Sequence, residues 1–162
     1  MQVCFESIPL TLEAFSALPG QDLKKAENTC ALFLLALHLY TKNKDEGIAA
    51  LNRLCGPRPL SPMGIQFIRD RLMDKAYLPL AYFDGAAPQN NYVPTLPYTL
   101  RLYPDPRPQD AEDGYMRLYL KTAGADSPRS ITLRCKDDAW FLWEYAGILM
   151  SIRLPAAEDP WA

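Results

Sequence analysis

The chain is short of the residues on which most catalytic and metal sites depend. It contains one histidine, His38, so a histidine-dependent triad or a histidine-rich metal site would rest on that residue alone. His38 lies in the most apolar segment of the sequence. Cys30 would be about 12 Å away from it along a helix, far beyond the ~3 Å that a nucleophile and its base require. We therefore expect a buried core histidine and no metal site.

Closely spaced cysteines and glycines are also missing. The four cysteines (Cys4, Cys30, Cys55 and Cys135) include no pair at CxxC spacing, and three of them lie in apolar stretches. We expect reduced thiols in a reducing compartment, and hence a cytoplasmic protein. Glycine occurs singly, and neither GxGxxG nor GxxxxGK(S/T) is present. The sequence predicts no cofactor.

The chain also lacks an excess of either positive or negative charge. The formal net charge is −2, and there is no basic tail or arm that would hold a phosphate backbone by bulk charge. The first ten residues lack the basic start and apolar stretch of a signal peptide. The apolar run Ala31–Tyr40 is much shorter than the roughly 20 residues of a membrane span. We expect a buried helix there and no membrane attachment.

Proline is the one residue that the chain has in excess. Fifteen prolines are about twice the average usage, and most lie between residues 56 and 108 or at the end of the chain. They indicate stiff, ordered connections. The 162 residues fit one domain that buries about 70% of its unfolded surface. We predict a single α+β domain over 1–162, with a helical part to about 78, a proline-rich loop at 79–97, a sheet at 98–154 and a tail at 155–162.

Three helices are predicted in the first half, after a short strand at 2–6 and a helical turn capped by Thr11. The first helix covers about 24–41, and its second half is apolar all round, as in a central core helix. The second follows a polar turn at 42–45 and ends at Gly56. The third begins at Ser61 as N-cap, with Pro62 at its first position.

From residue 98 onward the apolar residues alternate, which predicts strands. Four segments read this way: YTLRLY (98–103), YMRLYLK (115–121), SITLRCK (130–136) and AWFLWEY (139–145). Residues 136–138 fit a tight hairpin, and 146–154 fit a fifth strand or a helical turn. We predict three helices packed on one face of a four- to five-stranded, mainly antiparallel sheet. The long connection at 104–114 leaves the strand order open.

Alternation gives this sheet a polar face that includes Tyr115, Arg117 and Tyr119. Tyrosine beside arginine is what single-stranded nucleic acid uses for stacking and phosphate contact. The same residues are also common on solvent-exposed sheet faces, because they suit a pleated surface and discourage edge pairing. Acidic loops lie nearby in the sequence, so we favour a solvated or partner-covered face over nucleic acid.

Two acidic residues are candidates for chemistry. Glu144 lies among tryptophan and phenylalanine, an environment that suits a general acid. Its more ordinary role would be to pair with an arginine of a neighbouring strand, such as Arg134. Asp84 opens the loop that contains Asn90, Asn91 and Tyr92. Asparagines there can bind a ligand or hold their own turn, and we favour the structural role.

Five segments together resemble a family of small uncharacterised proteins from clostridia-like Firmicutes: GPRPLSPMGIQFIRDRL (56–72), YFDGAAPQNNYVP (82–94), GADSPRSITLR (124–134), WFLWE (140–144) and IRLPAAEDPWA (152–162). The resemblance covers most of residues 28–162. It implies a cytoplasmic bacterial protein or a module of a larger one. No activity is assigned to that family, so the resemblance implies no catalytic residues.

Three hypotheses for function follow. The first is a non-enzymatic module that binds another protein, with Arg58, Asp84, Asn90, Asn91, Tyr92, Asp126, Arg129 and Trp161 as contact residues, and Tyr115, Arg117 and Tyr119 as additions from the polar face. The second is a small-molecule enzyme that uses Glu144 or Asp84 with an arginine. The third is binding of single-stranded nucleic acid by the tyrosine–arginine face, which would weaken steeply with salt. The oligomeric state stays open.

Overall fold

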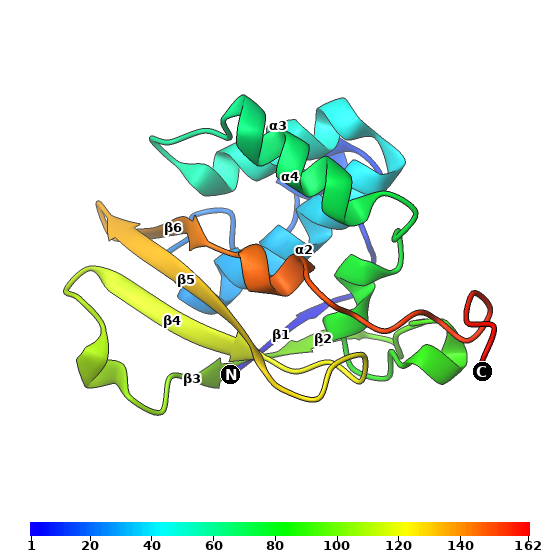
Figure 1. Ribbon diagram of the computed structural model, residues 1–162. Coiled ribbons are helices and arrows are strands. Elements are labelled where there is room, and N and C mark those ends of the chain that lie inside the picture. The colour runs from blue at the N-terminus through cyan, green and yellow to red at the C-terminus, as the bar shows by residue number, and fades with distance from the viewer.

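Helix α2 (Ala26–Lys42) runs through the middle of the computed structural model, which describes residues 1–162 and has an α+β fold (Figure 1). Thirteen of its 17 residues are buried. Helices α3 (Lys44–Cys55) and α4 (Pro62–Leu72) lie on one side of it, and the strands lie on the other (Figure 1). A helix covered on all sides must be apolar all round, so the predicted central core helix is confirmed.

The helix ends follow the predicted signals. Thr11 caps the short helix α1 (Leu12–Ser16), and the Ser61 hydroxyl accepts the Gly64 N–H at 3.0 Å at the start of α4. The turn between α2 and α3 is shorter than expected and consists of Asn43 alone, whose side chain caps α3. Gly47 lets the two helices pack closely there, because a Cβ on it would lie 2.2 Å from the Cα of Tyr40.

The strands form two antiparallel sheets. Strand β1 (Gln2–Phe5) pairs with β2 (Tyr98–Arg101), and a four-stranded sheet has the order β3-β4-β5-β6. Its strands are β3 (Tyr103–Pro104), β4 (Tyr115–Leu120), β5 (Arg129–Lys136) and β6 (Ala139–Glu144). The segment 98–103, predicted as one strand, therefore divides between the two sheets. Leu102 is the residue between them, and its N–H donates to the Met1 carbonyl at 2.9 Å.

Two connections late in the chain take compact forms. Asp137 and Asp138 both have positive φ and make the tight hairpin between β5 and β6. Residues 146–149 take the helical-turn option as a 3-10 helix. The free edge of β6 is covered at Trp140, whose N–H donates to the Leu23 carbonyl and whose carbonyl accepts the Thr29 hydroxyl.

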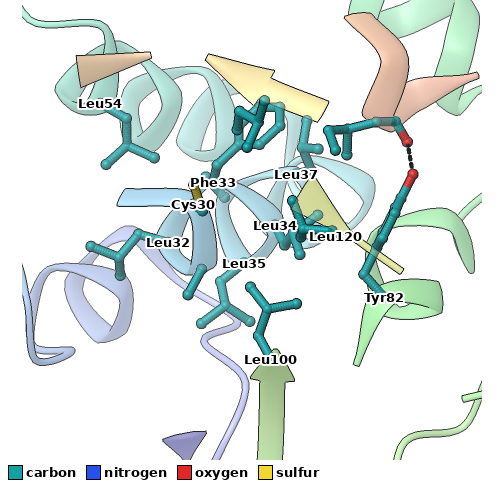
Figure 2. Packing of buried hydrophobic residues seen from close by; sticks show 14 of the residues in the cluster. Cys30, Leu32, Phe33, Leu34, Leu35, Leu37, Leu54, Tyr82, Leu100 and Leu120 are labelled. Carbon is teal, nitrogen blue, oxygen red and sulfur yellow. Dashed lines mark hydrogen bonds between the residues drawn. The ribbon is translucent and has the colours of Figure 1, made fainter. Parts of the chain in front are cut away.

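One hydrophobic core of 36 buried residues joins these elements (Figure 2). Figure 2 shows α2 side chains meeting Leu54 of α3, Leu100 of β2 and Leu120 of β4. The Tyr82 hydroxyl lies in this core and donates to the Ile148 carbonyl at 2.6 Å. No helix has both the length and the apolar composition of a membrane span.

Candidate interaction surface

A bulge in β6 lies at Trp143, an aromatic residue of the polar face. Leu133 and Thr132 are consecutive in β5, but their partners in β6 are Leu142 and Glu144, so Trp143 is an extra residue between them. Alternation with the buried Leu142 already points Trp143 to the polar face. The bulge places Glu144 opposite Thr132, and so on the polar face as well. The Trp143 ring lies edge-on to Tyr115 of β4, with 5.5 Å between the ring centroids.

Two arginines pack against this tryptophan. The Arg134 guanidinium lies 4.7 Å from the centre of the Trp143 ring, and Tyr115 pairs directly with Arg134 across β4 and β5. Arg58, from the connection between α3 and α4, lies 4.0 Å from the same centre and donates to the Trp143 carbonyl at 3.4 Å. We name Arg58, Tyr115, Arg134 and Trp143 the arginine–tryptophan face.

The charges of both arginines are available to a ligand. Neither guanidinium has a carboxylate within ion-pairing distance, whereas five other arginines do. Contact with an aromatic ring holds a guanidinium in place without neutralising it. The prolines on both sides of Arg58 stiffen its backbone. The face thus presents two fixed positive charges on an aromatic base.

Two grooves border the face. One, of about 490 Å³, has an apolar wall that includes Leu60, Met63 and Phe67, with Arg58 and Glu144 at its rim. Met63 is 83% exposed, which is unusual for a large apolar residue. The other, of about 450 Å³, holds Arg58, Arg134 and Lys136 and contains no acidic residue. Together they suit a segment that carries both an apolar side chain and negative charge.

The Cys55 thiol, which lines both grooves, is not a nucleophile at neutral pH. Burial raises the pKa of Cys55 to about 11, and the charge of Arg58 opposes that rise only in part. Burial likewise raises the pKa of Tyr145 in the first groove to about 12. Both groups are therefore protonated at neutral pH, and Cys55 does not supply the thiolate that nucleophilic attack requires.

The structure brings three of the predicted site residues to this face: Arg58, Tyr115 and Glu144. Glu144 is exposed and pairs with Thr132 in the sheet. The expected ion pair between Glu144 and Arg134 is not formed, because Arg134 lies over the aromatic rings instead. Sequence reasoning did not select Trp143, although alternation with the buried Leu142 places it on the polar face. Its contacts with Arg58 and Arg134 depend on long-range packing.

The other polar-face residues lie further along β4. Arg117 forms a long ion pair with Asp105 at 4.0 Å, from the connection that precedes β4. Tyr119 is half-buried between Tyr103 and Ser130 of the neighbouring strands. Asp105 thus reduces the positive charge that Arg117 would offer to a phosphate backbone on the polar face of the sheet.

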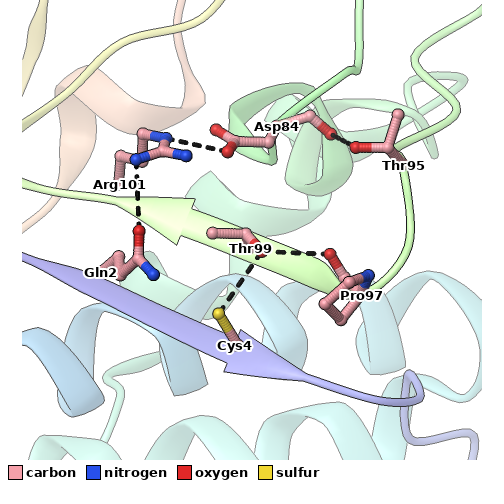
Figure 3. Close-up of polar contacts among 7 residues, drawn as sticks. All are labelled: Gln2, Cys4, Asp84, Thr95, Pro97, Thr99 and Arg101. Carbon is pink, nitrogen blue, oxygen red and sulfur yellow. Dashed lines mark hydrogen bonds and ion pairs between the residues drawn. The ribbon is translucent and has the colours of Figure 1, made fainter.

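Asp84 does have an arginine beside it. Arg101 Nε donates to Asp84 Oδ2 at 2.8 Å, and its Nη1 donates to Gln2 (Figure 3). The Asp84 carbonyl accepts both the N–H and the hydroxyl of Thr95. These bonds fasten the proline-rich loop to β1 and β2.

The asparagines of the same loop are also engaged within the fold. Asn90 accepts the Ala87 N–H and donates to the Gly85 carbonyl at 2.8 Å. Asn91 Oδ1 accepts the Ala157 N–H of the tail at 2.9 Å. Tyr92 is only 1% exposed, so it belongs to the core and not to a contact surface.

The last predicted residues surround the tail. Asp126 pairs with Arg153, Arg129 donates to the Ser151 carbonyl at 3.3 Å, and the Tyr92 hydroxyl donates to the Arg153 carbonyl. Trp161 is 92% exposed. Loop and tail thus form one unit, although more than 60 residues separate them in the chain.

Comparison with known proteins gives a family and no function. No curated protein and no solved structure matches the chain. A protein-family model described as a domain of unknown function, DUF6935, matches residues 7–156, which is nearly the whole chain. The protein therefore belongs to the DUF6935 family.

Proposed function

We propose that this protein is a non-enzymatic interaction module that holds an acidic segment of a protein partner on the arginine–tryptophan face. The observation that carries the proposal is the pair of arginines, Arg58 and Arg134, which pack on one tryptophan ring without a carboxylate partner. Tryptophan, tyrosine and arginine are the residues in which binding energy concentrates at protein interfaces.

The arrangement of these side chains supports binding over turnover. Both guanidiniums are held by ring contacts before a partner arrives, so little side-chain entropy is lost on binding. The apolar wall of Leu60, Met63 and Phe67 adds a place for one hydrophobic side chain beside the two charges. The buried thiol and phenol nearby are protonated at neutral pH and supply no base.

We also place the protein in the cytoplasm of a clostridia-like Firmicute. The sequence resemblance supports the source. The four cysteines support the compartment, because all are free thiols and two of them are buried.

The test is direct binding of short labelled peptides, measured by fluorescence anisotropy. Each peptide carries two or three Asp or Glu residues beside one Trp, Phe or Leu, and a matched set has Lys in place of the acids. We expect micromolar binding of the acidic set only. Arg58→Ala and Arg134→Ala each weaken it at least fivefold, whereas Arg107→Ala leaves it unchanged, because Arg107 is an exposed arginine that lies outside the face.

Two results would overturn this proposal. Equal binding of acidic and basic peptides would show that the face does not select charge. Tight binding of a labelled single-stranded oligonucleotide, lost in both arginine variants and falling steeply with salt, would assign the face to nucleic acid instead.

A further inference from the structure

The tail of this chain presents an exposed tryptophan with acidic neighbours. Trp161 is the most exposed large apolar residue of the molecule, at 92%. Glu158 and Asp159 precede it in one turn, and Asp159 Oδ1 accepts the Trp161 N–H at 2.8 Å. We name Glu158, Asp159 and Trp161 the tail knob.

The tail knob is held rigidly on the body. Asn91 Oδ1 accepts the Ala157 N–H at 2.9 Å, and the Ala156 N–H donates to the Pro88 carbonyl at 2.8 Å. Pro155 is buried. These contacts end directly before Glu158, which lines a groove of the body beside Tyr77, so the knob has an anchored base. Little of its freedom remains to be lost on binding.

The tail knob and the arginine–tryptophan face are complementary. The face and its acid-free groove carry Arg58, Arg134 and Lys136, and the knob carries two carboxylates. The groove beside Met63 and Phe67 offers an apolar wall, and the knob offers one large aromatic side chain. A buried tryptophan removes roughly 150–250 Å² from water, enough to anchor a small contact.

The two parts cannot meet within one molecule. In Figure 1, β6 and the connection between α3 and α4 lie at the left of the molecule, and the C-terminal end lies at the far right. The face and the tail knob are therefore on opposite sides of the molecule, and depth along the view can only add to their separation. Trp161 lies only four residues beyond the anchored Ala157, too few for its side chain to cross the body.

We infer that the tail knob of one copy docks on the arginine–tryptophan face of a second copy. This inference rests on the proposed function and names the partner of that same face. Two different surfaces meet, so the contact is head-to-tail and leaves one free face and one free knob on every dimer. Copies therefore add into short chains or close into a ring as the concentration rises. A contact made by a single turn is small, so self-association falls in the micromolar range or weaker.

The experiment measures mass by sedimentation velocity and light scattering from about 5 to 500 µM, a range chosen for a small contact. We expect wild type to move from the monomer mass of 18.3 kDa to dimers and larger species. Arg58→Glu removes the face and Trp161→Ala removes the knob, so each variant alone stays monomeric. Arg107→Glu and Leu96→Ala, a charge reversal and an exposed apolar truncation elsewhere, associate as wild type does.

Mixing the two monomeric variants gives the sharper result. Arg58→Glu retains its knob and Trp161→Ala retains its face, so an equimolar mixture forms a dimer of twice the monomer mass and nothing larger. Circular dichroism of each variant checks the fold. A variant that fails to fold is replaced by Arg134→Glu for the face or by Glu158→Arg with Asp159→Arg for the knob.

A wild-type protein that stays monomeric at 500 µM overturns this inference, and so does a mixture that forms no dimer. If acidic peptides still bind the face in the anisotropy assay and Arg58→Ala still weakens them, the proposed function stands with a different partner. If peptides and copies both fail to bind, the proposed function fails as well.

Discussion

Asn91 Oδ1 lies 2.9 Å from the Ala157 amide nitrogen and accepts its hydrogen, which ties the proline-rich loop to the tail across 66 positions of sequence. Asn91 also has φ of +56°, in the left-handed region that asparagine tolerates better than most residues. One residue thus supplies both the turn and the anchor.

Replacing Asn91 separates these two roles. We expect Asn91→Ala to lower the free energy of unfolding by about 2 kcal/mol, through the lost hydrogen bond and the strained backbone. Asn91→Gly loses only the hydrogen bond, so its free energy of unfolding is lower than that of wild type by about 1 kcal/mol. Urea unfolding measures both, and amide exchange at Ala157 becomes faster in both. Equal stability of the two variants would contradict the role of the left-handed backbone.

His38 predicts a specific loss of stability in mild acid. Burial, helped by Lys42, lowers the pKa of His38 from 6.5 to about 4 in the folded state. Between pH 6.5 and about 4, His38 is protonated in the unfolded chain but stays neutral in the folded protein. Stability is therefore full above pH 6.5 and falls as the pH drops toward 4, by about 3 kcal/mol at most.

Urea unfolding at several pH values checks this expectation against His38→Gln. The carboxylates titrate in both proteins, so the difference between the two curves isolates the histidine. We expect the variant to lose less stability than wild type between pH 6.5 and 4. Parallel curves would mean that the pKa of His38 is the same in the folded and unfolded protein, which contradicts the expected shift.

Tyr82→Phe tests the buried hydroxyl. The change removes the donor to the Ile148 carbonyl and leaves that carbonyl without a partner in the core, which costs about 1–3 kcal/mol. Tyr98→Phe is the matched control, because the half-buried Tyr98 hydroxyl makes no hydrogen bond within the protein. We expect its free energy of unfolding to change by less than about 0.5 kcal/mol.

Two glycines within helices should respond in opposite directions to alanine. A methyl group at Gly47 would overlap Tyr40 of α2, so Gly47→Ala forces the two helices apart and costs about 3 kcal/mol or more. At Gly64 the nearest atoms are 3.5 Å away, and the helix gains up to about 1 kcal/mol from alanine. The midpoint of thermal unfolding should fall in Gly47→Ala and rise in Gly64→Ala. Stabilisation by Gly47→Ala would contradict the close packing of the two helices.

Local signals explain what could be predicted from the sequence. Ser61, Pro62 and Gly56 mark helix ends because each acts on the backbone within a few residues, and the apolar run in α2 reports its own burial. Long-range pairing has no such signal. The division of residues 98–103 depends on β1, near the start of the chain. The contacts of Trp143 with Arg58 and Arg134 need β5 and the connection between α3 and α4 to lie beside β6. The candidate face was therefore visible in parts, as Arg58, Tyr115 and Glu144, but not as one surface.

The covered edge of β6 also bears on how any partner can bind. Since Leu23 and Thr29 occupy the main-chain groups of Trp140, an incoming strand cannot extend the sheet by continuous backbone pairing at that edge. Under the proposed function, selectivity would then reside in side chains such as Arg58, which lie on the surface and contribute little to the core. Within a family that shares this framework, exchanging those few side chains could change the partner while the architecture stays the same.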